Sequence, residues 1–150
     1  MKFVNGDITD IEYGAIIQQV NCQGVMGAGV AKALYTKWPV IKSKYEWFSD
    51  RPNKNALYGM IQTINVTPQI TVYNSFSQFD YGTHDKQTNE AMLINNINMI
   101  CKAYAGLNAQ SGNYIPVYVP YGIGCGLGGG NWAFVYYGIA NNENLTVVKL

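Results

Sequence analysis

The chain carries little charge and almost no arginine or histidine. Its 150 residues include 10 Lys and Arg, 9 Asp and Glu and one His, for a formal charge of +1. A single arginine, Arg51, cannot build the broad basic face on which nucleic-acid binders or cationic membrane-surface helices depend. One histidine and three scattered cysteines are too few for a zinc cage. We therefore expect no nucleic-acid partner, no membrane partner, no metal and no cofactor.

Disulfide patterns and long apolar segments are missing as well. The three cysteines, Cys22, Cys101 and Cys125, are odd in number and widely spaced, which argues against a disulfide framework and favours a reducing compartment. No apolar run approaches the roughly 18 residues of a membrane span. The first residues lack the charged-then-apolar layout of a signal peptide. We expect a cytoplasmic, monomeric protein.

What is present is an alternation of strand and helix patterns in a chain whose length suits one domain, residues 1–150. Strands are predicted at residues 3–4, 15–20, 60–66, 70–73, 114–119 and 145–150. Helices are predicted at residues 30–38 and 40–48, from an N-cap at Thr88 to a stop at Gly106, and at residues 132–139 after Asn131. This alternation predicts a layered α/β domain with a largely parallel sheet.

Two glycine-rich loops, residues 21–29 and 121–130, each follow a predicted strand and open a predicted helix. Ligands of open α/β sheets bind outside the carboxyl ends of the strands. Glycine lets the backbone approach a ligand, and a helix N-terminus offers free N–H groups. The pair of loops therefore predicts a diphosphate cradle; the alternative is that the glycines only make tight turns. Residues 124–129 match G-x-G-x-x-G, but too near the C-terminus for a dinucleotide fold, and no P-loop occurs.

The motifs resemble those of a known family. Gly-Asp-Ile-Thr at residues 6–9, the segment 19–31 and Pro-Tyr-Gly-Ile-Gly-Cys-Gly-Leu at residues 120–127 resemble the macrodomain, an ADP-ribose-binding module. The resemblance covers nearly the whole chain. It implies a three-layer α/β/α fold with a central mixed, largely parallel sheet, and a small-molecule ADP-ribose derivative as the ligand.

The resemblance also implies roles by position. Asp7 would accept the adenine amine, the Ile8 N–H would bind a ring nitrogen, and Asn21 would hold the distal ribose. Alternatives are an Asx turn for Asp7, a loop hydrogen bond for Asn21, and ordinary packing for Cys22 and Cys125. The implied ligand-binding residues are Asp7, Ile8, Thr9, Asn21, Gln23, Gly24, Met26, Gly27, Ala28, Gly29, Val30, Tyr121, Gly122, Ile123, Gly124, Cys125, Gly126 and Leu127.

The branch of the family is indicated by further segments. Residues 76–82 and the Gly-Gly-x-Trp ending are similar to ADP-ribose 1″-phosphate phosphatases, including bacteriophage ones, which would place the protein in the host cytoplasm. Gly-Cys-Gly-Leu resembles the terminal ADP-ribose hydrolases. However, Gly128 stands where that branch has an aspartate, Ser77 or Gln78 where it has a lysine, and Asn131 where phosphatases often have Asp.

Three functions follow from these motifs. The leading one is dephosphorylation of ADP-ribose 1″-phosphate, with Asn21, Asp80 and His84 as the candidate catalytic residues. A non-catalytic binder of ADP-ribose-type nucleotides is the alternative, because the loop carboxylates are missing. Removal of ADP-ribose from proteins is the third. For His84, the alternative to catalysis is a solvated side chain in a polar loop.

Overall fold

A six-stranded sheet forms the centre of the computed structural model, which describes residues 1–150. Its strand order is β1-β6-β5-β2-β4-β3, and every neighbouring pair is parallel except β3 and β4. The strands are β1 Lys2–Asn5, β2 Gly14–Asn21, β3 Ile61–Asn65, β4 Ile70–Gln78, β5 Val117–Pro120 and β6 Leu145–Lys149. The predicted mixed, largely parallel sheet is confirmed.

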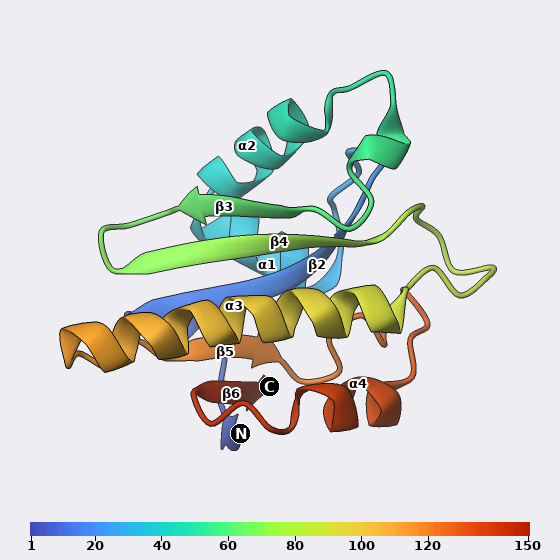
Figure 1. The fold of residues 1–150 in the computed structure, drawn as a ribbon. Coiled ribbons are helices and arrows are strands. Elements are labelled where there is room, and N and C mark those ends of the chain that lie inside the picture. Colours follow the sequence, from blue (N-terminus) through green and yellow to red (C-terminus); the bar gives the residue numbers. More distant parts are fainter.

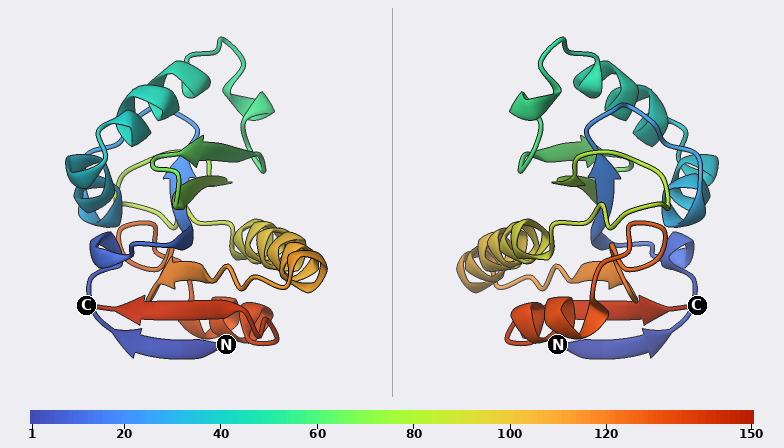
Figure 2. Two further views of the ribbon diagram at one scale, coloured as in Figure 1. Left: turned by 90° about the vertical axis from the view of Figure 1, so that its left-hand side faces the viewer. Right: turned by 90° about the vertical axis from the view of Figure 1, so that its right-hand side faces the viewer.

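Helices cover both faces of this sheet (Figures 1 and 2). Helices α1, Gly29–Lys37, and α2, Val40–Ser49, lie on one face; α3, Glu90–Ser111, and α4, Trp132–Ile139, lie on the other. Because successive residues of a strand point to opposite faces, Ile16 packs with Leu34 of α1 while Ile17 packs with Leu93 of α3. The fold therefore has the predicted three layers, α/β/α.

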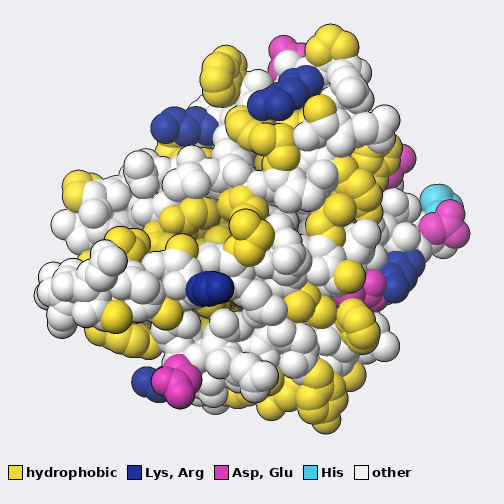
Figure 3. All heavy atoms as spheres, viewed as in Figure 1, with side chains coloured by type: hydrophobic (Ala, Val, Ile, Leu, Met, Phe, Trp, Pro, Cys, Tyr) yellow, Lys and Arg dark blue, Asp and Glu magenta, His cyan; other side chains and the backbone are white.

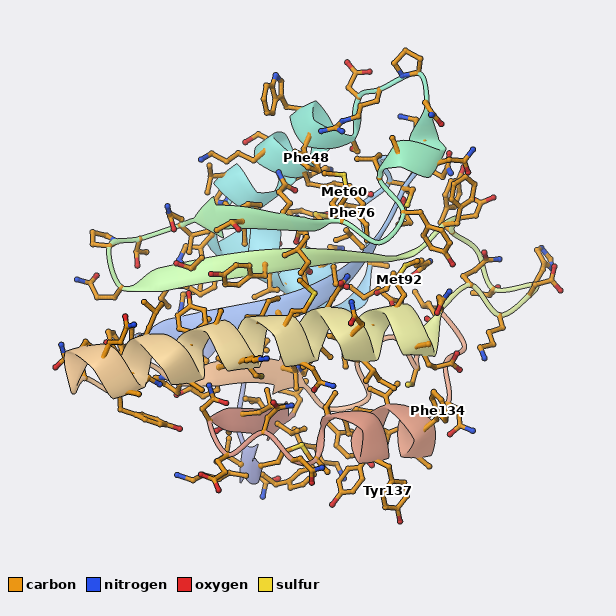
Figure 4. The ribbon with its side chains drawn as sticks, in the orientation of Figure 1. Phe48, Met60, Phe76, Met92, Phe134 and Tyr137 are labelled. Atoms are coloured by element: carbon orange, nitrogen blue, oxygen red, sulfur yellow. The ribbon has the colours of Figure 1, made fainter.

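The side chains in Figure 4 show how differently α2 and α4 use their aromatic residues. Phe48 of α2 points toward Phe76 of β4, their ring centres 5.5 Å apart, and Phe76 is fully buried. Phe134 and Tyr137 of α4 point outward and are 57% and 77% exposed. The core on the α2 side thus contains stacked aromatic rings, whereas Phe134 and Tyr137 of α4 lie on the surface, as does Trp47 of α2.

Most predicted elements are confirmed, but the ends of α3 are wrong. The helix begins at Glu90 after Asn89, whose side chain accepts the Met92 N–H, and not after Thr88. It continues through Gly106, since one glycine inside a helix costs only about 1 kcal/mol, and ends at Gly112, with φ 72°. In addition, β4 runs to residue 78 rather than 73, and β5 begins at residue 117 rather than 114.

The position of the site follows from the strand order. After β2 the chain forms β3 and β4 on one side of β2, whereas after β5 it forms β6 in the opposite direction across the sheet. The neighbouring strands β2 and β5 pair at only two positions, Ala15 with Val117 and Ile16 with Tyr118. Such a switch point is where open α/β sheets bind ligands. The right panel of Figure 2 looks onto this edge, where the loops after β2 (blue), β4 (yellow-green) and β5 (orange) gather. No helix is long and apolar enough to cross a membrane.

Candidate functional site

Three adjoining cavities form one cleft along this edge. The central cavity, about 350 Å³, lies between the start of α1 and residues 120–128. It shares Val30 and Tyr121 with a cavity of about 540 Å³ beside Asp7, here called the Asp7 cavity. It shares Ala28 and Leu127 with a cavity of about 310 Å³ beside Asn21, the Asn21 cavity.

The loop after β5 has unpaired N–H groups on residues that line the central cavity. Its other N–H groups are used within the protein; that of Ile123, for example, donates to the Pro120 carbonyl and that of Cys125 to the Gly122 carbonyl. Gly122 and Gly124 have φ values of +71° and +73°, which favour glycine, and this backbone alternates bonded with free N–H groups. The N–H groups without a partner belong to residues that all line the central cavity: Gly122, Gly124, Gly126, Leu127 and Gly128.

The start of α1 lies across the cavity and also has free donors. The N–H groups of Gly27, Ala28, Gly29 and Val30 have no partner. Gly29 and Val30 belong to the first turn of α1, which lacks intrahelical acceptors, and Gly27 and Ala28 directly precede it. No Lys, Arg, His, Asp or Glu lines the central cavity or the Asn21 cavity. Two rows of neutral donors and a helix N-terminus are suited to an anion such as a diphosphate. That the glycines hold a diphosphate, rather than only make tight turns, stays a prediction.

Asp7 caps the short 3₁₀ helix η1, Ile8–Asp10, at the end of the Asp7 cavity. Its Oδ1 accepts the Thr9 N–H at 2.9 Å and the Thr9 hydroxyl at 2.7 Å, and these bonds hold the pKa of Asp7 below its usual value. The Asx-type turn is thus present. Oδ2 has no partner, so an ionised oxygen remains available on a residue that lines the cavity.

Asn21 organises the loop after β2. Its Nδ2 donates to the Val25 carbonyl at 2.7 Å, and its Oδ1 accepts the Gln23 N–H at 3.0 Å. The Tyr45 hydroxyl lies 2.9 Å from the same Oδ1, and burial raises the pKa of Tyr45, which stays protonated. The loop hydrogen bond is therefore what the structure shows. A contact of Asn21 with a ligand stays a prediction, although the residue lines its cavity.

A polar network under the loop after β5 was not foreseen from the sequence. The Thr88 hydroxyl donates to the Gly124 carbonyl, and Gln19 Nε2 donates to that hydroxyl at 2.8 Å. The N–H groups of Gln87 and Thr88 both donate to the Gly128 carbonyl. The sequence signal that could have indicated this network is the polar side chain of Gln19 inside the otherwise apolar pattern of β2.

The same network leaves no room for a side chain at Gly128. A Cβ there would lie 2.4 Å from Thr88 Oγ1 and 3.0 Å from the Gly124 carbonyl oxygen. Contacts this short force a neighbour to move, and one of the neighbours is backbone. The loop is therefore packed for a glycine at the position where the terminal ADP-ribose hydrolases have an aspartate.

The structure does not bring two candidate catalytic residues into the cleft. Asp80 and His84 are exposed and line none of the three cavities. The imidazole, cyan in Figure 3, protrudes at the right-hand margin of the molecule. Tyr81 and Gly82, between them, do line the Asn21 cavity. Catalytic roles for Asp80 and His84 stay predictions.

Four predicted ligand-binding residues also lie outside the cavity walls. Thr9 supports Asp7, and Gln23 Nε2 donates to the Phe79 carbonyl. Gly24 and Cys125 line none of the three cavities. Burial raises the pKa values of Cys22 and Cys125 to about 11, so both stay thiols, as the packing alternative expects. All other predicted ligand-binding residues line the cleft.

Comparison with known proteins places the fold. No family model and no curated protein matches the chain. A protein of unknown function from Bacteroides thetaiotaomicron is similar at TM-score 0.78 and 24% identity, covering 99% of this chain and 97% of that one. A macrodomain protein from Streptomyces coelicolor matches at TM-score 0.75 and 24% identity, over 98% and 97%. Thermosipho africanus DarTG in complex with ADP-ribose matches at TM-score 0.73 and 17% identity, over 99% and 42%.

Proposed function

We propose that this chain, a single domain with the macrodomain fold, binds ADP-ribose. Adenine would occupy the Asp7 cavity, the diphosphate the central cavity and the distal ribose the Asn21 cavity. The observation that carries the proposal is the pair of rows of unpaired N–H groups on either side of a central cavity that no charged side chain lines. The similar fold of Thermosipho africanus DarTG, whose structure contains ADP-ribose, supports it.

We further propose that the distal end of the cleft takes a phosphate on C1″ and releases it by hydrolysis. Gln78, Tyr81 and Gly82, from the phosphatase-like segment and its end, line the Asn21 cavity. The free N–H of Gly27 would stabilise charge on the leaving phosphate, and Asp80 or a backbone group would orient water. The second candidate is a non-catalytic binder, which is favoured by the lack of any carboxylate or imidazole in the cavity wall.

One experiment separates these two candidates. The protein is incubated with ADP-ribose 1″-phosphate, and phosphate release is followed while binding of ADP-ribose is measured by calorimetry. Binding with turnover supports the phosphatase, and binding without turnover supports the binder. Asp80→Ala and His84→Ala are assayed alongside. Unchanged turnover of His84→Ala would return this histidine to a solvated role.

ADP-ribose binding is expected to depend weakly on salt. Neutral N–H donors do not attract the diphosphate over long range, and the only cleft cation is Lys149 of the Asp7 cavity, whose Nζ lies 4.7 Å from the Tyr121 ring centre. A tenfold rise in ionic strength should change the Kd by less than about threefold. Calorimetry at both salt concentrations measures this. A loss of affinity much larger than threefold would show that a cation holds the diphosphate.

Asp7 is expected to select adenine. Asp7→Asn keeps an oxygen to cap η1 but replaces the free ionised Oδ2 by a donor, so ADP-ribose should bind about tenfold more weakly. The hypoxanthine analogue, which lacks the amine, should bind more weakly than ADP-ribose to the wild type but not to the variant. Equal binding of both ligands to the wild type would remove Asp7 from the adenine site.

No sugar–lysine adduct is expected. Covalent attack requires a deprotonated lysine at the sugar, and no lysine lines the central or Asn21 cavity. Mass spectra of the protein after incubation with ADP-ribose should show the unmodified mass, and glutamate-linked ADP-ribose should be released slowly. A stable mass gain on a lysine with rapid release would instead support the hydrolase.

A further inference from the structure

A chain of buried amides crosses the sheet beneath α1 and α2. Gln62 Nε2 of β3 donates to the Lys44 carbonyl at 3.0 Å. Asn74 Nδ2 of β4 donates to Gln62 Oε1 at 3.0 Å, and Gln18 Nε2 of β2 donates to Asn74 Oδ1 at 2.8 Å. The three side chains are between 0% and 6% exposed. The chain therefore runs from α2 through three strands to β2.

The direction of this amide chain is fixed at its α2 end. A backbone carbonyl only accepts hydrogen bonds, so Gln62 must turn its NH₂ toward Lys44 and its oxygen toward Asn74. Asn74 and then Gln18 must follow the same orientation. The group left at the β2 end is consequently an oxygen, Gln18 Oε1, and not a donor.

That oxygen is the one buried side-chain polar atom of the protein without a hydrogen-bond partner. Gln18 is 1% exposed and lines the central cavity, on the α1 side of the sheet. Leaving a buried acceptor unpaired is unfavourable, because the atom has lost its hydrogen bonds to water without gaining another. A hydrogen-bond donor bound beside Gln18 Oε1 would therefore stabilise the complex.

We propose that Gln18 is a specificity-determining residue of the cleft: its Oε1 accepts a hydrogen bond from an O–H group beside the bound diphosphate. The inference rests on the proposed ADP-ribose binding. A diphosphate at neutral pH has no proton to donate, so it cannot itself satisfy this acceptor. The donor is either a ribose hydroxyl of the ligand or a water that donates one hydrogen to Gln18 and the other to a phosphate oxygen. In both cases the central cavity offers the ligand one acceptor, Gln18 Oε1, beside its many N–H donors.

Gln18→Met tests this proposal, with Gln62→Met as the matched control. Both substitutions remove one buried amide from the same chain, but Gln62 lines none of the three cavities. Calorimetry should show roughly tenfold weaker ADP-ribose binding for Gln18→Met and a clearly smaller loss for Gln62→Met, which keeps the Gln18 acceptor but removes the bond that orients the amide chain. Unchanged affinity of Gln18→Met, or an equal loss in both variants, would overturn the inference.

Deoxy analogues of ADP-ribose distinguish the two donors. If the loss caused by Gln18→Met vanishes for one analogue, the missing hydroxyl is the donor; if it persists for all of them, water is the donor. A crystal structure of the wild-type complex gives an independent measurement, with an oxygen expected within about 3.2 Å of Gln18 Oε1. No oxygen there would overturn the inference even if the variants fail to fold. Wild type that does not bind ADP-ribose would instead overturn the proposed function, and this inference with it.

Discussion

Replacing Gly27 or Gly126 with valine is expected to abolish measurable ADP-ribose binding while the fold survives. A Cβ at either position would meet no protein atom within 4 Å, so the folded chain has room for it. Gly126 lines the central cavity and Gly27 the Asn21 cavity, so the added side chain would occupy the place of the ligand. Losing two hydrogen bonds to a charged group, each worth about 1.5–3 kcal/mol, weakens binding by roughly 100-fold or more.

Gly106→Val is the matched control. Gly106 lies within α3, also has no atom within 4 Å of an added Cβ, and lines none of the cavities. Calorimetry and thermal unfolding of the three variants measure affinity and stability separately. Wild-type affinity in both Gly27→Val and Gly126→Val would mean that the two loops are only turns.

Introducing the hydrolase-type carboxylate by Gly128→Asp should also remove binding, but for a different reason. The Cβ would lie 2.4 Å from Thr88 Oγ1 and 3.0 Å from the Gly124 carbonyl oxygen, so the loop must move away from Thr88. That movement would misplace the free N–H groups of Gly124 and Gly126. We expect roughly 100-fold weaker ADP-ribose binding and a lower melting temperature.

Gly128→Ala separates the size of the side chain from its charge. Alanine brings the same Cβ without a carboxylate, so it should lose most of the affinity that aspartate loses. Near-normal binding by Gly128→Ala, with loss only in Gly128→Asp, would show that repulsion of the diphosphate dominates. Normal binding by both would show that the Thr88 frame does not hold the loop.

The sequence predicts the elements whose signals are local. Asn131 was expected to cap a helix at residues 132–139, and its side chain does accept the Phe134 N–H. The start of α3 was missed because Thr88 and Asn89 are both good caps and stand side by side. The choice between them is made by the Gly124 carbonyl, which binds the Thr88 hydroxyl from a loop 36 residues away. No local pattern contains that contact.

For the candidate site too, the sequence predicts the features with local signals and misses those that depend on long-range contacts. The glycine-rich loops were found because a strand, a glycine loop and a helix follow one another in sequence. The hydrogen bonds of the Gln18 and Gln19 side chains were missed because they depend on β4 lying beside β2. His84 is a candidate because a histidine near the carboxylate of Asp80 can form an acid–base pair, yet His84 is exposed and lies outside the cleft wall, which Tyr81 lines. Which strands are neighbours and which way a loop runs depend on contacts between residues that are far apart in the sequence.

The most direct test of the account is a titration of the isotope-labelled protein with ADP-ribose, followed by the amide signals in NMR. The account predicts that the largest shifts belong to the unpaired N–H groups of residues 27–30 and of Gly122, Gly124, Gly126, Leu127 and Gly128. It also predicts saturation at micromolar ligand, equivalent to about −8 kcal/mol or better. The bonded N–H groups of Ile123 and Cys125 should shift less. Unshifted spectra at millimolar ADP-ribose, or shifts confined to a surface away from the cleft, would contradict it.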